Sequence, residues 1–515
     1  MRPAEAGRSR FDHLVQDGPG PDQIVDHAVD AVAFPAEVRD QPRCGDLGRS
    51  AVRVPHAGQQ LGDLLAVQAR GEEFLDEDDP VDRPVGEVAM AAGGAVGRQQ
   101  ALLLVVAERP LAHAGPLGQL PDPHSPPRRR PKALEADTGV NFYRTRMTNT
   151  AAGTASASAL FEPARLGPLD LPNRLVMAPM TRNRASADGV PQPLMATYYA
   201  QRASAGLIIA EAATPNAVGQ TYPNITAIHD ATHVAGWRGV TDAVHAAGGR
   251  MFLQLQHGGR VGHPATSGLT PVAPSPVPLP ETIFTPSGHR PSVVPREMTA
   301  ADIRTTVADF AAAARNAIDA GFAGVEVHSA NGHLLHQFLA TNTNRRTDAY
   351  GGSVAARIRF AVEVTEAVAD AIGAERVGVR ISPGTTVNGV EEDDTELLYP
   401  AFVEALAALG PAYLHLVHAD PDQPLFRHIR ENWPTTLMAN PVLGPELPAD
   451  GGAHAAGRLL TAGADLIALG RPFLANPDLV TRLRTGAPVN PVRDRFMMYV
   501  GGERGYTDYP TLTVA

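Results

Sequence analysis

Cysteine and lysine are almost missing from this sequence of 515 residues. Cys44 is the single cysteine, which excludes internal disulfides, four-cysteine zinc sites and cysteine-ligated iron–sulfur clusters. Lys132 is the single lysine, so residues 133–515 contain none. Schiff-base chemistry through a lysine amine is therefore excluded from that part of the chain.

Long hydrophobic runs and positive charge are also scarce. No apolar run reaches the roughly 18 residues that a transmembrane helix needs, and the N-terminus lacks the basic-then-apolar order of a signal peptide. The formal net charge of -11 disfavours binding to nucleic acid or to an anionic membrane. We therefore expect a cytoplasmic protein, monomeric or homodimeric, whose partners are small molecules.

Residues 1–146 differ in composition from the rest of the chain. They are dense in Arg, Asp, Gly and Pro, show no sustained helical or strand period, and end in the Pro-rich run at 121–131. Three interpretations stay open: a disordered extension, a small domain of unrecognised type, or a start codon assigned too far upstream. The third is favoured, because Met147 opens a small-residue segment typical of the start of a free-standing enzyme. The domain boundary is thus predicted between residues 1–146 and 147–515.

From Leu160 onward, short β-rich runs alternate with helical segments. This alternation predicts an α/β fold with a parallel sheet, and eight repeats close it into a (β/α)₈ barrel. A Pro-rich excursion at residues 258–297 follows the third strand and is too long for a simple connection, so we expect it to be a lid over a site. One predicted strand begins at Gly324; the others lie at 173–180, 206–213, 250–257, 377–383, 413–417, 436–440 and 466–470.

The stretch from Gly324 to Gly352 has the richest chemistry. It begins as a short apolar strand, then presents His328, Asn331 and His333, and continues into an apolar helical turn. Polar groups at the C-terminal end of a strand are how (β/α)₈ barrels build active sites. A histidine ring nitrogen and an asparagine amide can both donate to one substrate oxygen and polarise it. The alternative is that these residues only cap a loop.

Two adjacent motifs, HSANGHLLHQFL at 328–339 and NRRTDAYGGS at 344–353, resemble the active-site strand and loop of the old yellow enzyme family. The resemblance implies non-covalent FMN and NAD(P)H as reductant. It implies ping-pong reduction of the activated C=C bond of α,β-unsaturated carbonyls, or of nitro compounds and nitrate esters. His328 and Asn331 would bind the carbonyl oxygen. Where the family usually has a proton-donating Tyr, this chain has His333, so either His333 or solvent supplies the proton. If His333 is the acid and has the ordinary histidine pKa of about 6.5, the rate of the reaction should fall as pH rises through that value, because the imidazolium loses its proton.

Arg380 stands alone among apolar residues in the predicted fifth strand, VGVRISP. An unpaired buried charge is expensive, so Arg380 must have a partner. The resemblance implies that the partner is the N1–C2=O region of the flavin, which becomes anionic on reduction. The alternative is an ion pair with Glu326 or Glu211.

The resemblance assigns further contacts. Thr181 would bond the flavin O4, and Gln254 would bind its pyrimidine edge. Gly470 and Arg471, just before Pro472, suit a phosphate at a helix start. The implied cofactor set is Pro179, Met180, Thr181, Ala212, Gln254, Arg380, Val442, Gly470, Arg471 and Tyr499; the implied substrate pocket is Gln256, where relatives usually carry Trp, with His328, Asn331 and Tyr499.

No metal site is predicted. His328, His333 and His336 lack the i,i+4 pairing of a helical zinc site, and the acidic run at 391–394 is expected to be a solvated loop. Three rival functions were weighed. The larger iron–sulfur branch of the same family needs a cluster of cysteines, which this chain does not have. A non-redox phosphate-binding lyase or isomerase would use Arg471 for the phosphate and His328 as base. A flavin-binding barrel that has lost turnover is suggested only by His333 and Gln256.

Overall fold

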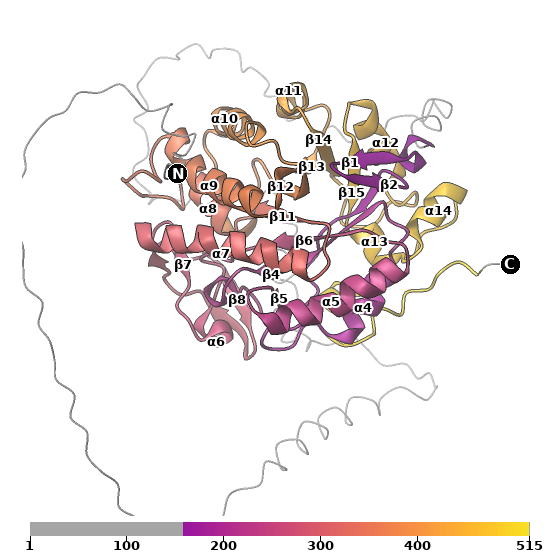
Figure 1. Ribbon diagram of the computed structural model, residues 1–515, viewed down its shortest axis with the longest axis horizontal. Helices are drawn as coiled ribbons and strands as arrows, with labels where there is room; N and C mark the ends of the chain where they lie inside the picture. Colours follow the sequence, from indigo (N-terminus) through magenta and orange to yellow (C-terminus); the bar gives the residue numbers. More distant parts are fainter. Residues whose placement is uncertain (1–157, 514–515) are drawn as a thin grey trace, which may run out of the picture. The chain divides into compact units, whose positions relative to one another are not determined.

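The computed structural model describes residues 158–513, and these contain a closed barrel of eight parallel strands (Figure 1). The barrel closes because β15 pairs with β3 and β3 pairs with β4. The predicted (β/α)₈ barrel is confirmed, whereas the predictions for residues 1–146 fall outside the described residues. The barrel strands are β3 (Leu175–Met177), β4 (Leu207–Thr214), β6 (Met251–Leu255), β11 (Gly324–Ser329), β12 (Val377–Ile381), β13 (Tyr413–Ala419), β14 (Thr436–Pro441) and β15 (Leu466–Leu469).

A helix follows each barrel strand, because parallel neighbours need a crossover connection. Capping residues fix where several helices begin: Asp230 accepts backbone N–H groups at the start of α5, and Thr299 with Asp302 forms a capping box on α7. None of the helices within residues 158–513 has the length and apolar character needed to cross a bilayer. In chain order the longer α-helices are α4 (Pro193–Ala200), α5 (Ala231–Ala246), α7 (Ala300–Asp319), α9 (Val354–Ile372), α10 (Thr395–Ala407), α11 (Pro424–Asn432), α12 (Ala453–Thr461) and α14 (Leu479–Thr485).

An apolar hairpin packs against the amino ends of the barrel strands. It consists of β1 (Ala164–Leu166) and β2 (Leu169–Leu171), and its leucines share one buried cluster with the first residues of β4, β13 and β15. Gly378 in β12 belongs to the same region: a Cβ there would sit 2.0 Å from the ring of Tyr413. With the amino end filled by apolar side chains, the carboxyl end is left for chemistry.

The Pro-rich excursion at residues 258–297 has secondary structure of its own. Its elements are α6 (Pro264–Ser267), β7 (Val272–Ala273), the antiparallel hairpin of β8 (Thr282–Thr285) with β9 (Gly288–Pro291), and β10 (Arg296–Glu297), which pairs with β7. Arg260 joins the excursion to the loop after β12, because its Nη2 donates to the carbonyls of Asn388 and Gly389, each at 2.8 Å. The excursion therefore lies against carboxyl-end loops, and its role as a lid stays a prediction.

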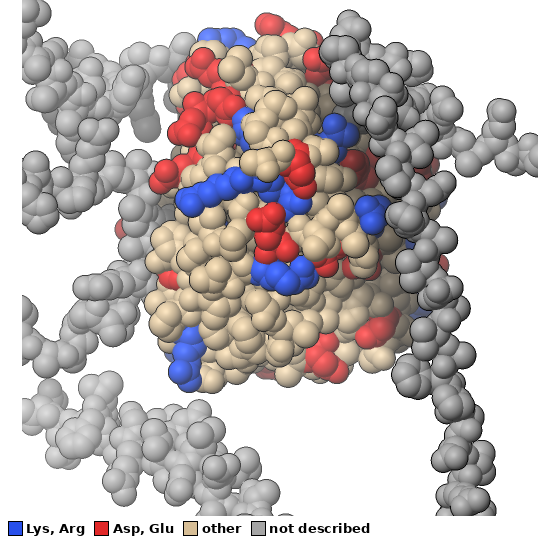
Figure 2. All heavy atoms as spheres, turned by 90° about the vertical axis from the view of Figure 1, so that its left-hand side faces the viewer, with Lys and Arg blue, Asp and Glu red and all other residues tan. Residues whose placement is uncertain are grey.

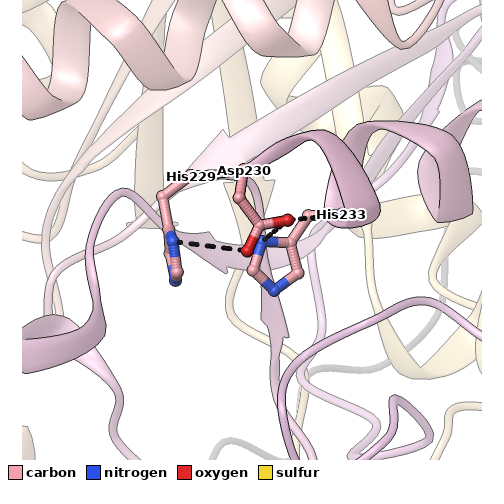
Figure 3. Close-up of side chains that lie close together, drawn as sticks. All are labelled: His229, Asp230 and His233. Carbon is pink, nitrogen blue, oxygen red and sulfur yellow. Dashed lines mark hydrogen bonds and ion pairs between the residues drawn. The ribbon is translucent and has the colours of Figure 1, made fainter. Parts of the chain in front are cut away.

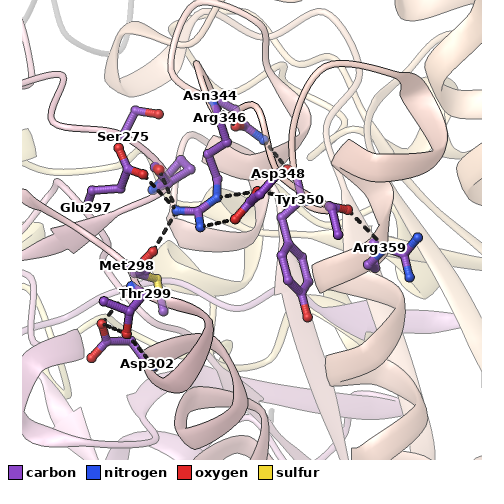
Figure 4. A network of polar contacts seen from close by, with 12 residues as sticks. Ser275, Glu297, Met298, Thr299, Asp302, Asn344, Arg346, Asp348, Tyr350 and Arg359 are labelled. Atoms are coloured by element: carbon purple, nitrogen blue, oxygen red, sulfur yellow. Dashed lines mark hydrogen bonds and ion pairs between the residues drawn. The ribbon is translucent and has the colours of Figure 1, made fainter. Parts of the chain in front are cut away.

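Arg346 is a clamp that joins the interior of this excursion to the residue that directly follows it (Figure 4). Its Nη1 donates to the carbonyls of Pro274 at 3.0 Å and Met298 at 2.6 Å, and its guanidinium pairs with Asp348. The turn around the clamp is tight: a Cβ on Gly351 would lie 2.3 Å from the Arg346 carbonyl oxygen. The motif NRRTDAYGGS thus has a structural role that its residues alone did not reveal.

Replacing Arg346 with Ala should lower the free energy of unfolding by about 2–3 kcal/mol, because two buried carbonyls lose their donor. The matched control is Arg296→Ala. The Arg296 side chain is 51% exposed and pairs with Asp302, so its loss should cost less than about 1 kcal/mol. Urea denaturation followed by circular dichroism measures both, and equal effects would contradict the clamp.

On the face shown in Figure 2, acidic and basic side chains are interspersed.

Candidate functional site

Polar side chains from four neighbouring strands meet inside the carboxyl half of the barrel. Glu326 and His328 of β11 share one face of their strand under its two-residue period. The register places Glu326 opposite Gln254 of β6, His328 opposite Arg380 of β12, and Arg380 opposite His415 of β13. Parallel pairing therefore stacks these side chains into one polar layer.

Glu326 is the centre of the deeper part of this layer. The carboxylate is fully buried and accepts from Gln254 Nε2 at 2.8 Å, Tyr413 Oη at 3.1 Å and His415 Nδ1 at 2.8 Å. Burial would raise the pKa of Glu326, but His415, Arg380 and the hydrogen bonds hold it below its ordinary value. The network fixes the Gln254 amide with its nitrogen toward Glu326. The Gln254 oxygen makes no hydrogen bond within residues 158–513, so it is the atom left for a ligand.

The Arg380 guanidinium is buried without adequate partners. Only 6% of the residue is exposed, and its Nε and Nη1 have no hydrogen-bond partner among the described residues. Its one side-chain bond is long, 3.5 Å from Nη2 to Asn440 Oδ1. No ion pair forms with Glu326 or Glu211, so that alternative is wrong. Burial lowers the pKa of Arg380, although the charge of Glu326 opposes this. Unsatisfied buried donors are costly, and the site is suited to an anionic or polar ligand.

His328 lies near the carboxyl end of β11, and Asn331 and His333 follow the strand. The rings of His328 and His333 have centroids 4.9 Å apart, and Nδ1 of each is buried without a hydrogen-bond partner in the described chain. Asn331 adopts a left-handed backbone, φ 53°, which costs energy in a non-glycine residue. Its N–H donates to Ser382 Oγ at 2.8 Å and its carbonyl accepts from Asn388 Nδ2 at 2.7 Å. The loop after β12 therefore holds the strained Asn331, whose side-chain amide bonds nothing in residues 158–513.

The histidines of the site are neutral near pH 7. Burial lowers the pKa of His333 to about 4 and that of His257, which follows β6, to about 3. Burial, with repulsion from His333 and Arg380, takes the pKa of His328 well below 6.5. A neutral imidazole keeps one N–H donor and one lone pair. His257 Nδ1 accepts from the Gly259 N–H at 3.1 Å, so its buried Nε2 carries a proton that has no acceptor among the described residues. His257 is a residue of this site to which the sequence analysis gave no role.

Glu392 corrects the expectation that residues 391–394 form a solvated loop. Its side chain is fully buried and accepts from His336 Nε2 at 2.9 Å, Tyr399 Oη at 2.7 Å and the Gly384 N–H at 2.8 Å. Burial would raise the pKa of the carboxyl, but these bonds, first that from His336, keep it low. His336 belongs to α8 (Leu334–Leu339), so Glu392 ties the helix after the His328 loop to the loop after β12.

The C-terminal segment, residues 497–509, returns to the loop after β3. Arg182 donates to the carbonyls of Met498 and Gly505, each at 2.9 Å, and Arg184 donates to those of Met497, Met498 and Val500. The Arg182 guanidinium also lies 4.8 Å from the ring centroids of Tyr198 and Tyr506, which stack on each other. Two arginines beside the predicted flavin residue Thr181 thus hold the segment that carries Tyr499. The sequence showed that Arg182 follows a predicted strand, but it did not show that Arg182 holds the C-terminal segment.

The predicted phosphate residues are only partly brought together. Gly470 follows β15, and a Cβ there would lie 3.3 Å from the Met180 sulfur. Arg471 begins α13 (Arg471–Ala475), and its guanidinium donates to the Leu443 carbonyl at 3.1 Å and to those of the next two residues. Val442 is 60% exposed. Arg471 therefore holds the loop after β14, and its contact with a phosphate stays a prediction.

The remaining predicted residues lie around the same polar layer. Ala212 of β4 is opposite Gln254 in the sheet register, and Gln256, which follows β6, is only 4% exposed. Pro179 and Thr181 follow β3. The FMN expected from the resemblance fits this lining, because Arg380 supplies unpaired cationic donors and His328 and His333 each have an unpaired ring nitrogen.

Comparisons with known proteins agree on one family. A family model described as "NADH:flavin oxidoreductase / NADH oxidase family" matches residues 159–490. A probable flavin mononucleotide-dependent alkene reductase from Leishmania infantum is 41% identical over 376 residues, which cover 70% of this chain and 99% of that protein. The 12-oxophytodienoate reductase 1 of Oryza sativa subsp. japonica is 40% identical over 375 residues, covering 71% and 97%.

Solved structures give the same result. An old yellow enzyme homologue from Zymomonas mobilis is 39% identical with a TM-score of 0.65, covering 69% of this chain and all of that one. A morphinone reductase in complex with tetrahydroNAD is 43% identical with a TM-score of 0.65, covering 69% and 98%. These relatives are matched over nearly their whole length.

Arg380→Met should weaken FMN binding by about 10–100-fold, the cost of losing hydrogen bonds to a charged group. The same change should not lower the stability of the apoprotein, because an unpaired buried charge is removed. Arg380→Lys keeps the charge but not the planar donor fork, so its affinity should be intermediate. Fluorescence titration of apoprotein with FMN and urea denaturation measure the two quantities. Unchanged FMN affinity in Arg380→Met would make Arg380 a structural residue only.

Proposed function

Because the chain belongs to the NADH:flavin oxidoreductase / NADH oxidase family, the family of the old yellow enzymes, we propose that it reduces the activated C=C bond of α,β-unsaturated carbonyl compounds with NAD(P)H. Nitro compounds and nitrate esters are further substrates under the same proposal. The observation that carries it is the pair of neutral donors, the buried His328 and the half-buried Asn331, beside the unpaired Arg380. Family membership as a flavin oxidoreductase removes the lyase alternative.

FMN, when bound, supplies the hydride chemistry, taking a hydride from NAD(P)H and giving it to the substrate β-carbon. Arg380 and the Gln254 oxygen would hold the polar edge of the flavin, and Pro179–Thr181 and Ala212 would line it. His328 and Asn331 donate to the substrate carbonyl oxygen, which makes the β-carbon electron-poor. β11 holds the backbone of His328, and the bonds with Ser382 and Asn388 hold the backbone of Asn331, so both residues are positioned before substrate arrives.

The α-carbon must gain a proton when the β-carbon gains the hydride. His333 is neutral above its pKa of about 4, so it has almost no imidazolium to offer at pH 7. Under our proposal His333 acts as a relay: one ring nitrogen gives its proton to the α-carbon, and the other takes a proton from water. The sequence predicted that the reaction rate would fall as pH rises through about 6.5, the ordinary pKa of histidine. Because the pKa of His333 is lowered to about 4, that fall in rate is no longer expected. Direct protonation by solvent is the alternative.

Anaerobic spectroscopy of the purified protein tests the function. The visible flavin absorbance should bleach on addition of NADPH and return on addition of cyclohexenone. Bleaching without recovery, for this and a nitroalkene acceptor, would leave a flavin reductase that does not reduce activated alkenes. If neither NADPH nor NADH bleaches the flavin, the result would support the alternative of a flavin-binding barrel that has lost catalytic turnover.

His328→Ala or Asn331→Ala should slow reoxidation by cyclohexenone by about 10²–10³-fold, the usual cost of removing one preorganised donor. FMN content should stay near that of the wild type. His428→Ala and Asn432→Ala, both exposed on α11, are controls of the same residue types and should change neither quantity. Full activity in both site variants would place the substrate elsewhere on the barrel.

The reoxidation rate should be flat from about pH 5.5 to 9, because the lowered pKa of His333 keeps it neutral throughout. His333→Ala should slow protonation by about 10²-fold, and His333→Tyr should restore much of it. Stopped-flow reoxidation of the reduced enzyme by cyclohexenone measures all three. A decline centred near pH 6.5 would show an imidazolium donor with an ordinary pKa. An unchanged rate in His333→Ala would assign the proton to solvent.

A further inference from the structure

Three side chains with metal-binding atoms meet at the start of α5, in a part of the fold that the proposed reaction does not use. His229 and Asp230 immediately precede the helix, and His233 lies in its first turn (Figure 3). One ligand atom from each residue lies within 4.8 Å of the others. The site follows β5 (Thr226–Ala227), which extends the sheet beyond the carboxyl end of β4. His229 and His233 have the i,i+4 spacing of a helical zinc site, which His328, His333 and His336 lack.

Hydrogen bonding fixes the tautomer of His233. Its Nε2 lies 2.9 Å from the carbonyl oxygen of Asp188, and a carbonyl can only accept, so Nε2 carries the proton. In the neutral ring Nδ1 therefore has a lone pair. His233 is only 2% exposed, and Nδ1 is buried with no hydrogen-bond partner among residues 158–513. A metal-ligating histidine commonly donates its other N–H to a carbonyl in this way, which fixes the ring.

The lone pair of His233 points toward negative charge. Asp230 Oδ1 lies 3.1 Å from Nδ1, in a geometry that makes no hydrogen bond. The carboxylate already accepts the N–H groups of Thr232 and His233 as the cap of the helix. Two electron-rich atoms at this distance repel unless a positive species lies between them.

The spacing suits a small divalent ion. Tetrahedral zinc at about 2.0–2.1 Å from its ligands separates those ligands by roughly 3.3 Å. The His233–Asp230 distance of 3.1 Å already meets this requirement, and His229 Nδ1 lies 4.0 Å from Asp230 Oδ2. The His229 side chain is 31% exposed, so it is free to approach.

We propose that His229, Asp230 and His233 bind one zinc-type divalent ion, with water in the open fourth position. Two imidazoles and a carboxylate favour such an ion over magnesium, which prefers oxygen ligands. Through the Asp188 carbonyl, the bound ion would join the loop after β3 to the start of α5. Its role would be structural, since none of its ligands belongs to the catalytic set.

Isothermal titration of untagged, FMN-loaded enzyme with Zn²⁺, after removal of metal by a chelator, tests the proposal. Saturation at one Zn²⁺ per chain is expected, with no comparable binding of Mg²⁺. Asp230→Asn keeps a good helix cap but removes the charge, and His229→Ala removes an exposed ligand. Each should weaken Zn²⁺ binding by more than about 100-fold, the upper range for loss of a mere outer-shell partner.

His245→Ala is the matched control, because His245 is an exposed histidine in the last turn of the same helix. It should bind Zn²⁺ as the wild type does. FMN content measured on each sample shows that the variants are folded. Three results would overturn the proposal: no saturable binding at one equivalent, equal affinity for Mg²⁺, or wild-type affinity in both Asp230→Asn and His229→Ala.

Discussion

The unpaired guanidinium of Arg380 is the constraint on which the site depends. A buried cation with two unsatisfied nitrogens is unfavourable in the protein alone, and the barrel tolerates it because every neighbour is fixed. Glu326 is near enough to act on Arg380 electrostatically, yet its oxygens are occupied by Gln254, Tyr413 and His415. The network thus neutralises charge in the layer without satisfying the Arg380 donors. The fold keeps those donors for a ligand at a cost in stability, as functional sites often do.

The same positive charge also sets the protonation of its neighbours. Arg380 and burial together disfavour a second cation, so His328 and His415 have lowered pKa values. Neutral imidazoles donate hydrogen bonds without attracting a counter-ion, which suits the proposed reduction of an uncharged carbonyl compound. Electrostatics and hydrogen bonding therefore give a consistent picture of the polar layer.

Much of this arrangement was predictable, and the reason is periodicity. The two-residue alternation of a strand places Glu326 with His328, and burial of Arg380 in an apolar run demands a partner. Those arguments use only neighbours in sequence. The partners of Glu326, the clamp at Arg346 and the contacts of Arg182 with residues 497–509 join segments far apart in the chain, and a single sequence contains no signal for such pairings. The burial of Glu392 was mispredicted for the same reason, since its partners His336 and Tyr399 come from different helices.

The attachment of residues 497–509 to Arg182 and Arg184 has a consequence for the order of assembly. This segment follows all eight barrel strands in sequence, so the barrel is able to close before the segment docks. It is held chiefly through its backbone carbonyls, which any sequence provides, together with the Tyr506 ring. The bonds from Arg182 and Arg184 therefore do not depend on which residues supply the carbonyls. Two arginines that bind carbonyl oxygens would accordingly be able to hold a segment of different sequence in the same place.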